Sequence, residues 1–152
     1  MSVNEVANLE TLLSANPYPG RGIVLGQTPD GTRMVVGYFI MGRSPNRRNR
    51  VFERTEDGIR TRAYDPSKVE DPSPIIYNPL RTVDGTLIVT NGDQTDTVRD
   101  ALVAGRSFED ALETREFEPD APNLTPRISG HLLPDGRYQL SILKSADAEG
   151  SA

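Results

Sequence analysis

Apolar residues fall mostly into short runs separated by Gly, Pro, Asp and Asn, a pattern typical of antiparallel hairpins. Each predicted turn contains an Asp-Gly pair, which supplies the backbone freedom that a tight turn needs. The strand pairs that this pattern predicts are 23–26 with 33–41, 51–54 with 59–64, 75–83 with 86–90, and 127–133 with 137–143. The run 33–41 is almost continuously apolar, so we expect that strand to be buried on both faces.

Three segments have helical spacing instead. In 4–14, Val6, Leu9, Leu12 and Leu13 share one face, and 91–104 and 107–116 form a second and a third helix. Ser107 with Asp110 three residues later matches a capping box, with Asp in the usual Glu position. Hairpins with two helices between them predict an α+β fold, with the helices stacked on the sheet. At 152 residues, the chain suits a single domain.

Charge and composition exclude several classes of function. The net charge of −5 makes general nucleic-acid binding unfavourable. No apolar run reaches the length of a membrane span, and residues 1–15 have no signal-peptide pattern. There is no Cys, which fits a cytoplasmic protein and removes thiol chemistry, and the lone His131 cannot form a multi-histidine metal site. We therefore expect a cytoplasmic protein without a thiolate or multi-histidine metal site.

An arginine-rich segment interrupts this acidic chain. It contains Arg43, Arg47, Arg48 and Arg50, together with Asn49, directly after a predicted strand. Forked guanidinium donors suit a small phosphate or carboxylate ligand. A solvated turn would have the same composition, so both interpretations stay open.

Other candidates each have a structural alternative. The turn 91–97 could expose N–H groups to an anion at a helix N-terminus, but Asp93, Thr95 or Asp96 as helix caps is favoured. Tyr77 could be a core phenol. In the acidic loop that follows the helices, Glu118 could pair with Arg127 or act as a general base. Removal of Met1 would expose Ser2, an N-terminal nucleophile in some hydrolases, although Ser2 does not head a predicted strand.

Several segments, in this order, resemble the single-function IMP cyclohydrolase family first recognised in archaea. The matching segments are Tyr18-Pro19-Gly20-Arg21, Gly42-Arg43-Ser44, Asn49-Arg50, Tyr77-Asn78 with Arg81, Asn91-Gly92 with Thr95-Asp96-Thr97, Glu118 with Asp120, and Thr125-Pro126-Arg127-Ile128. The longer arginine-rich segment and the phrase Ser141-Ile142-Leu143-Lys144-Ser145-Ala146-Asp147 are most similar to bacterial members.

The resemblance implies a function, in which a formamidoimidazole-carboxamide ribonucleotide closes its second ring to give IMP without a metal or organic cofactor. It implies that Tyr77 and Glu118 transfer or orient protons and that Arg43 and Arg50 hold the phosphate or the oxyanion. Substrate-binding positions implied in this way are Arg21, Asn49, Asn91, Thr95, Asp96 and Arg127. The alternatives are a purine-nucleotide-binding protein without catalysis and an N-terminal-nucleophile amide hydrolase.

The implied fold is a four-layer αββα sandwich similar to the N-terminal-nucleophile hydrolases. Family chains continue with further strands after the segment that matches 144–147. We therefore expect a fold that lacks C-terminal strands in this chain, and association as a homo-oligomer or with a missing C-terminal piece, because an unfinished sheet edge favours association.

Overall fold

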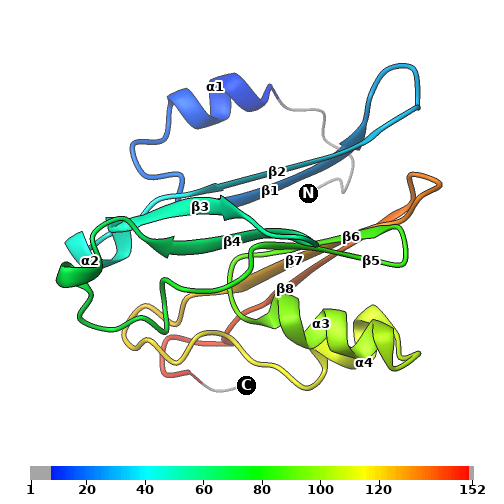
Figure 1. Ribbon diagram of the computed structural model, residues 1–152. Coiled ribbons are helices and arrows are strands. Elements are labelled where there is room, and N and C mark those ends of the chain that lie inside the picture. The colour runs from blue at the N-terminus through cyan, green and yellow to red at the C-terminus, as the bar shows by residue number, and fades with distance from the viewer. Residues whose placement is uncertain (1–7, 151–152) are drawn as a thin grey trace.

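The computed structural model describes residues 8–150, and its strands form two antiparallel sheets (Figure 1). The smaller sheet pairs β1 (Arg21–Gln27) with β2 (Met34–Ile40). The larger one has the order β3-β4-β5-β6-β7-β8, so each strand lies beside its neighbour in sequence. Its strands are β3 (Arg50–Arg54), β4 (Gly58–Ala63), β5 (Leu80–Val83), β6 (Thr86–Thr90), β7 (Arg127–Leu132) and β8 (Tyr138–Leu143).

Helices are few and short. They are α1 (Leu9–Ser14), α2 (Pro45–Arg48), the 3₁₀ turn η1 (Pro66–Lys68), α3 (Gln94–Val103) and α4 (Phe108–Leu112). The predicted α+β class is therefore confirmed. No helix in the described part of the chain is long and apolar enough to cross a membrane.

The turns confirm the hairpins that the sequence predicted. Between β5 and β6, Asp84 and Gly85 have φ angles of 46° and 75°, and Val83 pairs with Thr86. Two successive residues with positive φ form the hairpin turn whose twist matches that of the flanking strands. The Asp-Gly pair thus sets the register of this hairpin.

One face of the larger sheet is covered by α3 and α4, which lie below it in Figure 1. The core between them contains Ile88 of β6, Val98 and Ala101 of α3, and Phe108 and Leu112 of α4. The capping box that starts α4 is confirmed: the Ser107 hydroxyl accepts from the Asp110 N–H, and the Asp110 carboxylate accepts from the Ser107 N–H, each at 3.0 Å.

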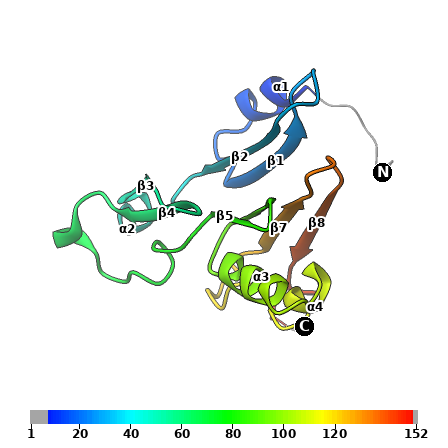
Figure 2. The ribbon, with the colours of Figure 1, turned by 45° about the vertical axis from the view of Figure 1, so that its right-hand side comes forward.

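The opposite face carries the β1–β2 hairpin, and α1 lies beyond it (Figure 2). The two sheets approach each other closely at Gly130 of β7. An added Cβ there would lie 3.1 Å from Leu25 of β1 and 3.1 Å from Val89 of β6. Ile88 and Val89 are both fully buried, so β6 is covered on its two faces.

Two predictions about the strands were wrong. The strand predicted for 75–83 begins only at Leu80, because the N–H groups of Ile75 and Ile76 both bond to the Pro72 carbonyl and curl the chain into a turn. The strand β2 is not buried on both faces, since it belongs to a two-stranded surface layer and Val35 is 45% exposed.

The predicted helices are also shorter in the structure. The segment 91–93 forms the turn before α3, and α4 ends at Leu112 rather than 116. The arginine-rich segment contains α2, which begins after Ser44: the Ser44 hydroxyl accepts from the Arg47 N–H, and Pro45 follows at the first helical position. Residues 4–7 of the first predicted helix, and Ser2, lie outside the described residues.

Candidate active site

Tyr77 lies in the turn before β5, where Thr61 of β4 holds its backbone. The Thr61 hydroxyl accepts from the Tyr77 N–H at 2.9 Å and lies 2.6 Å from the Ile75 carbonyl. The Thr61 N–H donates to the Tyr77 carbonyl at 2.8 Å. These bonds replace the ladder that an ordinary strand would form, and they fix a tyrosine that is only 6% exposed.

The phenol of Tyr77 meets a second tyrosine. Its hydroxyl oxygen lies 2.7 Å from that of Tyr38, which belongs to β2 in the other sheet. Burial raises the pKa of Tyr77, although the bond from Tyr38 and the charges of Arg50 and Arg21 oppose this effect. Burial likewise raises the pKa of Tyr38. Tyr77 thus keeps its phenol proton near pH 7, as a free tyrosine does, and this proton is the one it could donate.

Glu118 faces Arg21, the first residue of β1. The Arg21 Nη1 donates to Glu118 Oε1 at 2.5 Å and to the Asn91 carbonyl at 3.1 Å. The two charged side chains are 9% and 12% exposed. Burial lowers the pKa of Arg21, but the charge and hydrogen bond of Glu118 outweigh it, so the net shift is upward and Arg21 stays charged.

The rest of the acidic loop is folded toward the arginines. Asp120 accepts from the N–H and hydroxyl of Thr125 at 2.7 and 2.6 Å, and from Arg47 Nη2 at 3.1 Å. Burial raises the pKa of Asp120, but these bonds and the charge of Arg47 outweigh it and give a net lowering. Arg47 therefore joins the acidic loop to α2.

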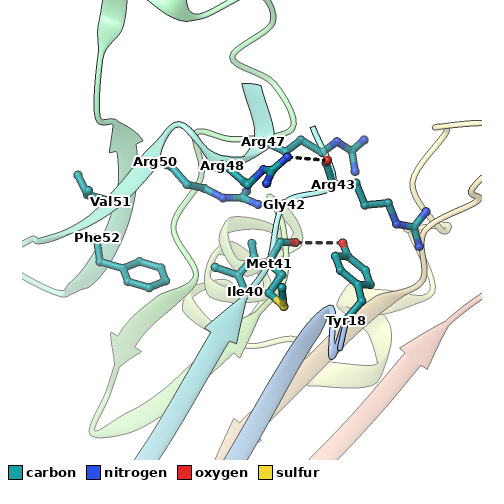
Figure 3. A pocket seen from close by; sticks show the side chains of 10 residues that line it. All are labelled: Tyr18, Ile40, Met41, Gly42, Arg43, Arg47, Arg48, Arg50, Val51 and Phe52. Carbon is teal, nitrogen blue, oxygen red and sulfur yellow. Dashed lines mark hydrogen bonds between the residues drawn. The ribbon is translucent and has the colours of Figure 1, made fainter. Parts of the chain in front are cut away.

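The arginine pocket is a cavity of about 600 Å³ between the end of β2 and the start of β3 (Figure 3). Arg43, Arg47 and Arg48 lie on the side of α2, and the ring of Phe52 lies across the pocket from Tyr18. Its lining residues are Tyr18, Ile40, Met41, Gly42, Arg43, Arg47, Arg48, Arg50, Val51 and Phe52.

Each of three arginines in this pocket has its own contacts. The Arg43 guanidinium lies 5.3 Å from the centre of the Tyr18 ring and donates to the Asn123 side chain, while Arg48 donates to the Arg43 carbonyl. In Arg50, Nη1 donates to the Pro74 carbonyl at 3.4 Å, and the buried Nη2 has no partner in the described part of the chain. Burial lowers the pKa of Arg50. A buried, unpaired guanidinium N–H is suited to an anionic ligand.

A second cavity, the Tyr77 pocket, has a volume of about 310 Å³. It is lined by Arg47, Asp71, Ser73, Pro74, Tyr77, Asn91, Gly92, Asp93, Glu118, Pro119, Asp120 and Arg127. The phenol, the carboxylate and an arginine thus share one cavity. A third cavity of about 250 Å³, the connecting pocket, includes Arg21, Asn91 and Thr125 and shares Tyr18, Met41 and Arg43 with the arginine pocket. Arg47 lines all three cavities.

The turn before α3 supplies one wall of the Tyr77 pocket. The Asn91 side chain donates to the Pro126 carbonyl and accepts from the N–H of Ile128 and from Gln94. At Gly92 an added Cβ would lie 2.8 Å from Arg127 Nη1, so a larger residue would displace that arginine. This turn sets the position of Arg127.

Asp93 stands at the N-cap position of α3 but does not cap it with its side chain. Its carboxylate accepts instead from Arg127 and Arg115, each at 2.6 Å. Burial raises the pKa of Asp93, but these two arginines outweigh it and produce a net lowering. Glu118 and Arg127 were one possible pair, but Glu118 pairs with Arg21 and Arg127 with Asp93.

Three of the sequence-predicted binding residues line none of these cavities. Asn49 bonds to the backbone of Asp65 through both its amide oxygen and nitrogen. Thr95 is fully buried against Thr90, with 2.7 Å between their hydroxyls. Asp96 accepts from Arg81 at 2.6 Å. Asn49 and Thr95 thus hold backbone groups, while Asp96 pairs with a side chain. Direct substrate contact by these three stays a prediction.

Two residues of the site were missed. The sequence counted Arg47 in the arginine cluster without singling it out, and Tyr38 appeared only as part of a strand. The Ser44-Pro45 start signal for α2 could have pointed to Arg47, since a helix there turns that side chain toward the acidic loop. No signal in the sequence places Tyr38 beside Tyr77, 39 positions later, because they meet only when the two sheets pack.

The fold and these cavities define an α+β protein with an arginine-lined pocket close to a buried tyrosine and a carboxylate. The sequence model of a family described as IMP cyclohydrolase-like protein matches residues 18–150, so the chain belongs to this family.

Archaeal relatives support the match. An IMP cyclohydrolase of Methanopyrus kandleri is 33% identical over 147 residues, which cover 88% of this chain and 72% of the relative. One of Methanococcus maripaludis strain C7 is 36% identical over 129 residues, covering 80% and 61%. One of Halobacterium salinarum is 32% identical over 136 residues, covering 86% and 64%. The matches thus span 61% to 72% of these relatives' own lengths.

Proposed function

We propose that this protein is an IMP cyclohydrolase, which closes the second ring of 5-formamidoimidazole-4-carboxamide ribonucleotide to give IMP and water in purine biosynthesis. The observation that carries this proposal is the Tyr77 pocket, in which Tyr77, Glu118 and Arg127 share one cavity in a chain of the IMP cyclohydrolase-like family.

The reaction needs little beyond orientation and proton transfer. The carboxamide nitrogen attacks the formyl carbon, and a new C–N bond forms. The formyl oxygen then leaves as water with one proton from the carboxamide nitrogen and one from the formamido nitrogen. Both reacting groups belong to one substrate, so holding them in contact supplies much of the acceleration. The remaining tasks are to stabilise an oxyanion and to move two protons.

The residues of the Tyr77 pocket suit these tasks. Tyr77 presents a phenol proton in this cavity, beside the Tyr38 hydroxyl, so it is assigned proton donation to the formyl oxygen. Glu118 is held by Arg21 at 2.5 Å, and it accepts or orients the proton of the attacking nitrogen. Asn91 and Arg127 line the same cavity and are assigned contacts to the substrate.

The phosphate is assigned to the arginine pocket, where Arg43 and Arg50 are its main partners. The unpaired Nη2 of Arg50 supports this assignment, because a bound phosphate would provide its missing acceptor. Arg47 lines the arginine, Tyr77 and connecting pockets, so it is placed to contact the ribose or the phosphate. Asn49, Thr95 and Asp96 stay predicted binding residues.

The finer features of the fold belong to the same proposal. The order of α1, the β1–β2 hairpin, the larger sheet and the α3–α4 pair supports a single-domain, four-layer αββα sandwich of the N-terminal-nucleophile-hydrolase kind. The edge strand β8 exposes Tyr138, Leu140 and Ile142, which supports association with a second copy or with a C-terminal piece. A cytoplasmic location fits an enzyme of nucleotide biosynthesis.

The test is turnover of the formylated precursor, followed by the absorbance of IMP. Wild-type protein should form IMP, and Tyr77→Phe and Glu118→Gln should each lose most of the rate. Tyr64→Phe and Glu56→Gln are matched controls, since both residues are exposed and line none of the three cavities, and they should keep it. An absence of turnover in the wild-type protein would rule out the enzyme.

The alternatives give different results in the same experiment. A nucleotide-binding protein without catalysis would bind IMP saturably, less tightly after Arg43→Ala or Arg50→Ala, and would form no product. An N-terminal-nucleophile amide hydrolase would require a mature chain that begins at Ser2, as found by mass spectrometry, and an activity that Ser2→Ala abolishes.

A further inference from the structure

Tyr38 brings a second, partly buried phenol to the proposed active site, from a different sheet. Its hydroxyl oxygen lies 2.7 Å from the Tyr77 hydroxyl, and within residues 8–150 this is its one hydrogen-bond partner. The ring packs edge-on against Phe52, with 6.0 Å between ring centres and an interplanar angle of 64°. This packing and the bond to Tyr77 hold the ring with its hydroxyl directed at Tyr77.

The two hydroxyls differ in what else they can reach. Tyr77 lines the cavity that also contains Glu118, whereas Tyr38 lines none of the three cavities of the site. Each hydroxyl has one proton to donate. If Tyr38 donates to the Tyr77 oxygen, the Tyr77 proton stays available to a ligand in the cavity. The reverse bond would use the Tyr77 proton on Tyr38 and leave the partly buried Tyr38 proton without an acceptor among residues 8–150, which is the less favourable arrangement.

We propose that Tyr38 is a positioning residue, whose O–H donates to the Tyr77 oxygen and directs the Tyr77 proton toward the substrate. This inference rests on the proposed cyclization activity. In the reaction, the Tyr77 O–H bond breaks as its proton passes to the formyl oxygen, and negative charge develops on the Tyr77 oxygen. The Tyr38 hydrogen bond strengthens as that charge grows, so it acts on the transition state more than on the bound substrate.

The kinetic test compares Tyr38→Phe in two backgrounds. In the wild-type background, kcat should fall about tenfold with KM unchanged, the effect of losing one hydrogen bond to an oxygen that becomes charged. In a Tyr77→Phe background, Tyr38→Phe should cause no further loss, because Tyr38 acts only through the missing hydroxyl. Tyr64→Phe, the same chemical change at a residue that is 75% exposed, should leave kcat unchanged in both backgrounds.

A spectroscopic arm tests the contact itself without substrate. In protein labelled with ¹³C at the tyrosine Cζ, the Tyr77 resonance is assigned by its loss in Tyr77→Phe. Tyr38→Phe should shift that resonance, and Tyr64→Phe should not. An unchanged Tyr77 resonance would overturn the hydrogen bond on which the proposal depends.

The outcomes separate this inference from the proposed function. Wild-type turnover with an unchanged kcat in Tyr38→Phe, or an equal loss in both backgrounds, would overturn the positioning role and leave the cyclohydrolase intact. No turnover in the wild-type protein would overturn both.

Discussion

Replacing Arg21 with methionine removes the cation that faces Glu118 across the site and keeps most of the side-chain volume. The Glu118 carboxylate, whose side chain is 12% exposed, would then lose its 2.5 Å partner while staying largely out of water. Breaking a fully buried pair costs about 3–5 kcal/mol. Because Glu118 borders a cavity that admits water, we expect a smaller loss of about 2 kcal/mol in the free energy of unfolding.

Urea denaturation followed by circular dichroism measures this loss. A change of about 2 kcal/mol corresponds to a lower midpoint by roughly 1 M. The double variant Arg21→Met/Glu118→Gln should recover part of the loss, because the amide can stay buried at lower cost than an unpaired carboxylate. The matched control is Arg60→Met, which breaks the exposed pair with Glu53 and should cost about 0.5 kcal/mol or less.

Additive effects of Arg21→Met and Glu118→Gln on the free energy of unfolding would contradict this expectation. Additivity would mean that the two side chains do not stabilise each other, and that Arg21 contributes through its bond to the Asn91 carbonyl alone.

Three further predictions concern a close backbone contact, a helix cap and a partly buried carboxylate. Gly42→Ala places a Cβ 2.4 Å from the Arg47 carbonyl carbon, so it should lower the affinity for IMP measured by calorimetry. Gly26→Ala, which has open space around it, should leave the affinity unchanged. Equal affinities of the two variants would contradict the close packing at Gly42. Ser107→Ala removes the α4 cap and should lower the free energy of unfolding by about 1 kcal/mol in urea, and no change would refute the capping role. The pKa of Asp120 is lowered in the folded protein, so its contribution to stability is present above its ordinary pKa of 3.8 and lost as the pH falls through the lower folded value. Asp120→Asn should therefore flatten the acid side of the stability–pH curve, and an unchanged curve would show that its bonds do not favour the charged form.

The sequence predicted the elements whose causes are local. Asp84-Gly85 determines a hairpin by its own backbone preferences, and Ser107 with Asp110 starts α4 by two short-range bonds. The runs of apolar residues located every strand of both sheets. Their ends and their burial were less accurate, because Pro72 and its neighbours curl the chain before Leu80, and because the exposure of Val35 depends on what covers β2.

Single residues of the site could be predicted from the sequence. Contacts between residues that are distant in the sequence could not. Tyr77 and Glu118 could be proposed from the family resemblance. The partners of these residues, Tyr38 and Arg21, depend on how β1 and β2 lie on the larger sheet. No spacing along the chain records that packing, so the tyrosine pair and the Arg21–Glu118 bridge emerged only from the structure.

The cyclohydrolase proposal is tested most directly by measuring, side by side, how much IMP the wild-type protein and Tyr77→Phe form from the formylated precursor. We expect steady product formation by the wild-type protein and a loss of most of that rate in the variant, with IMP binding retained in both. Product formed at the same rate by both proteins would contradict the role of the Tyr77 pocket, and saturable IMP binding with no product from either would contradict the cyclohydrolase itself.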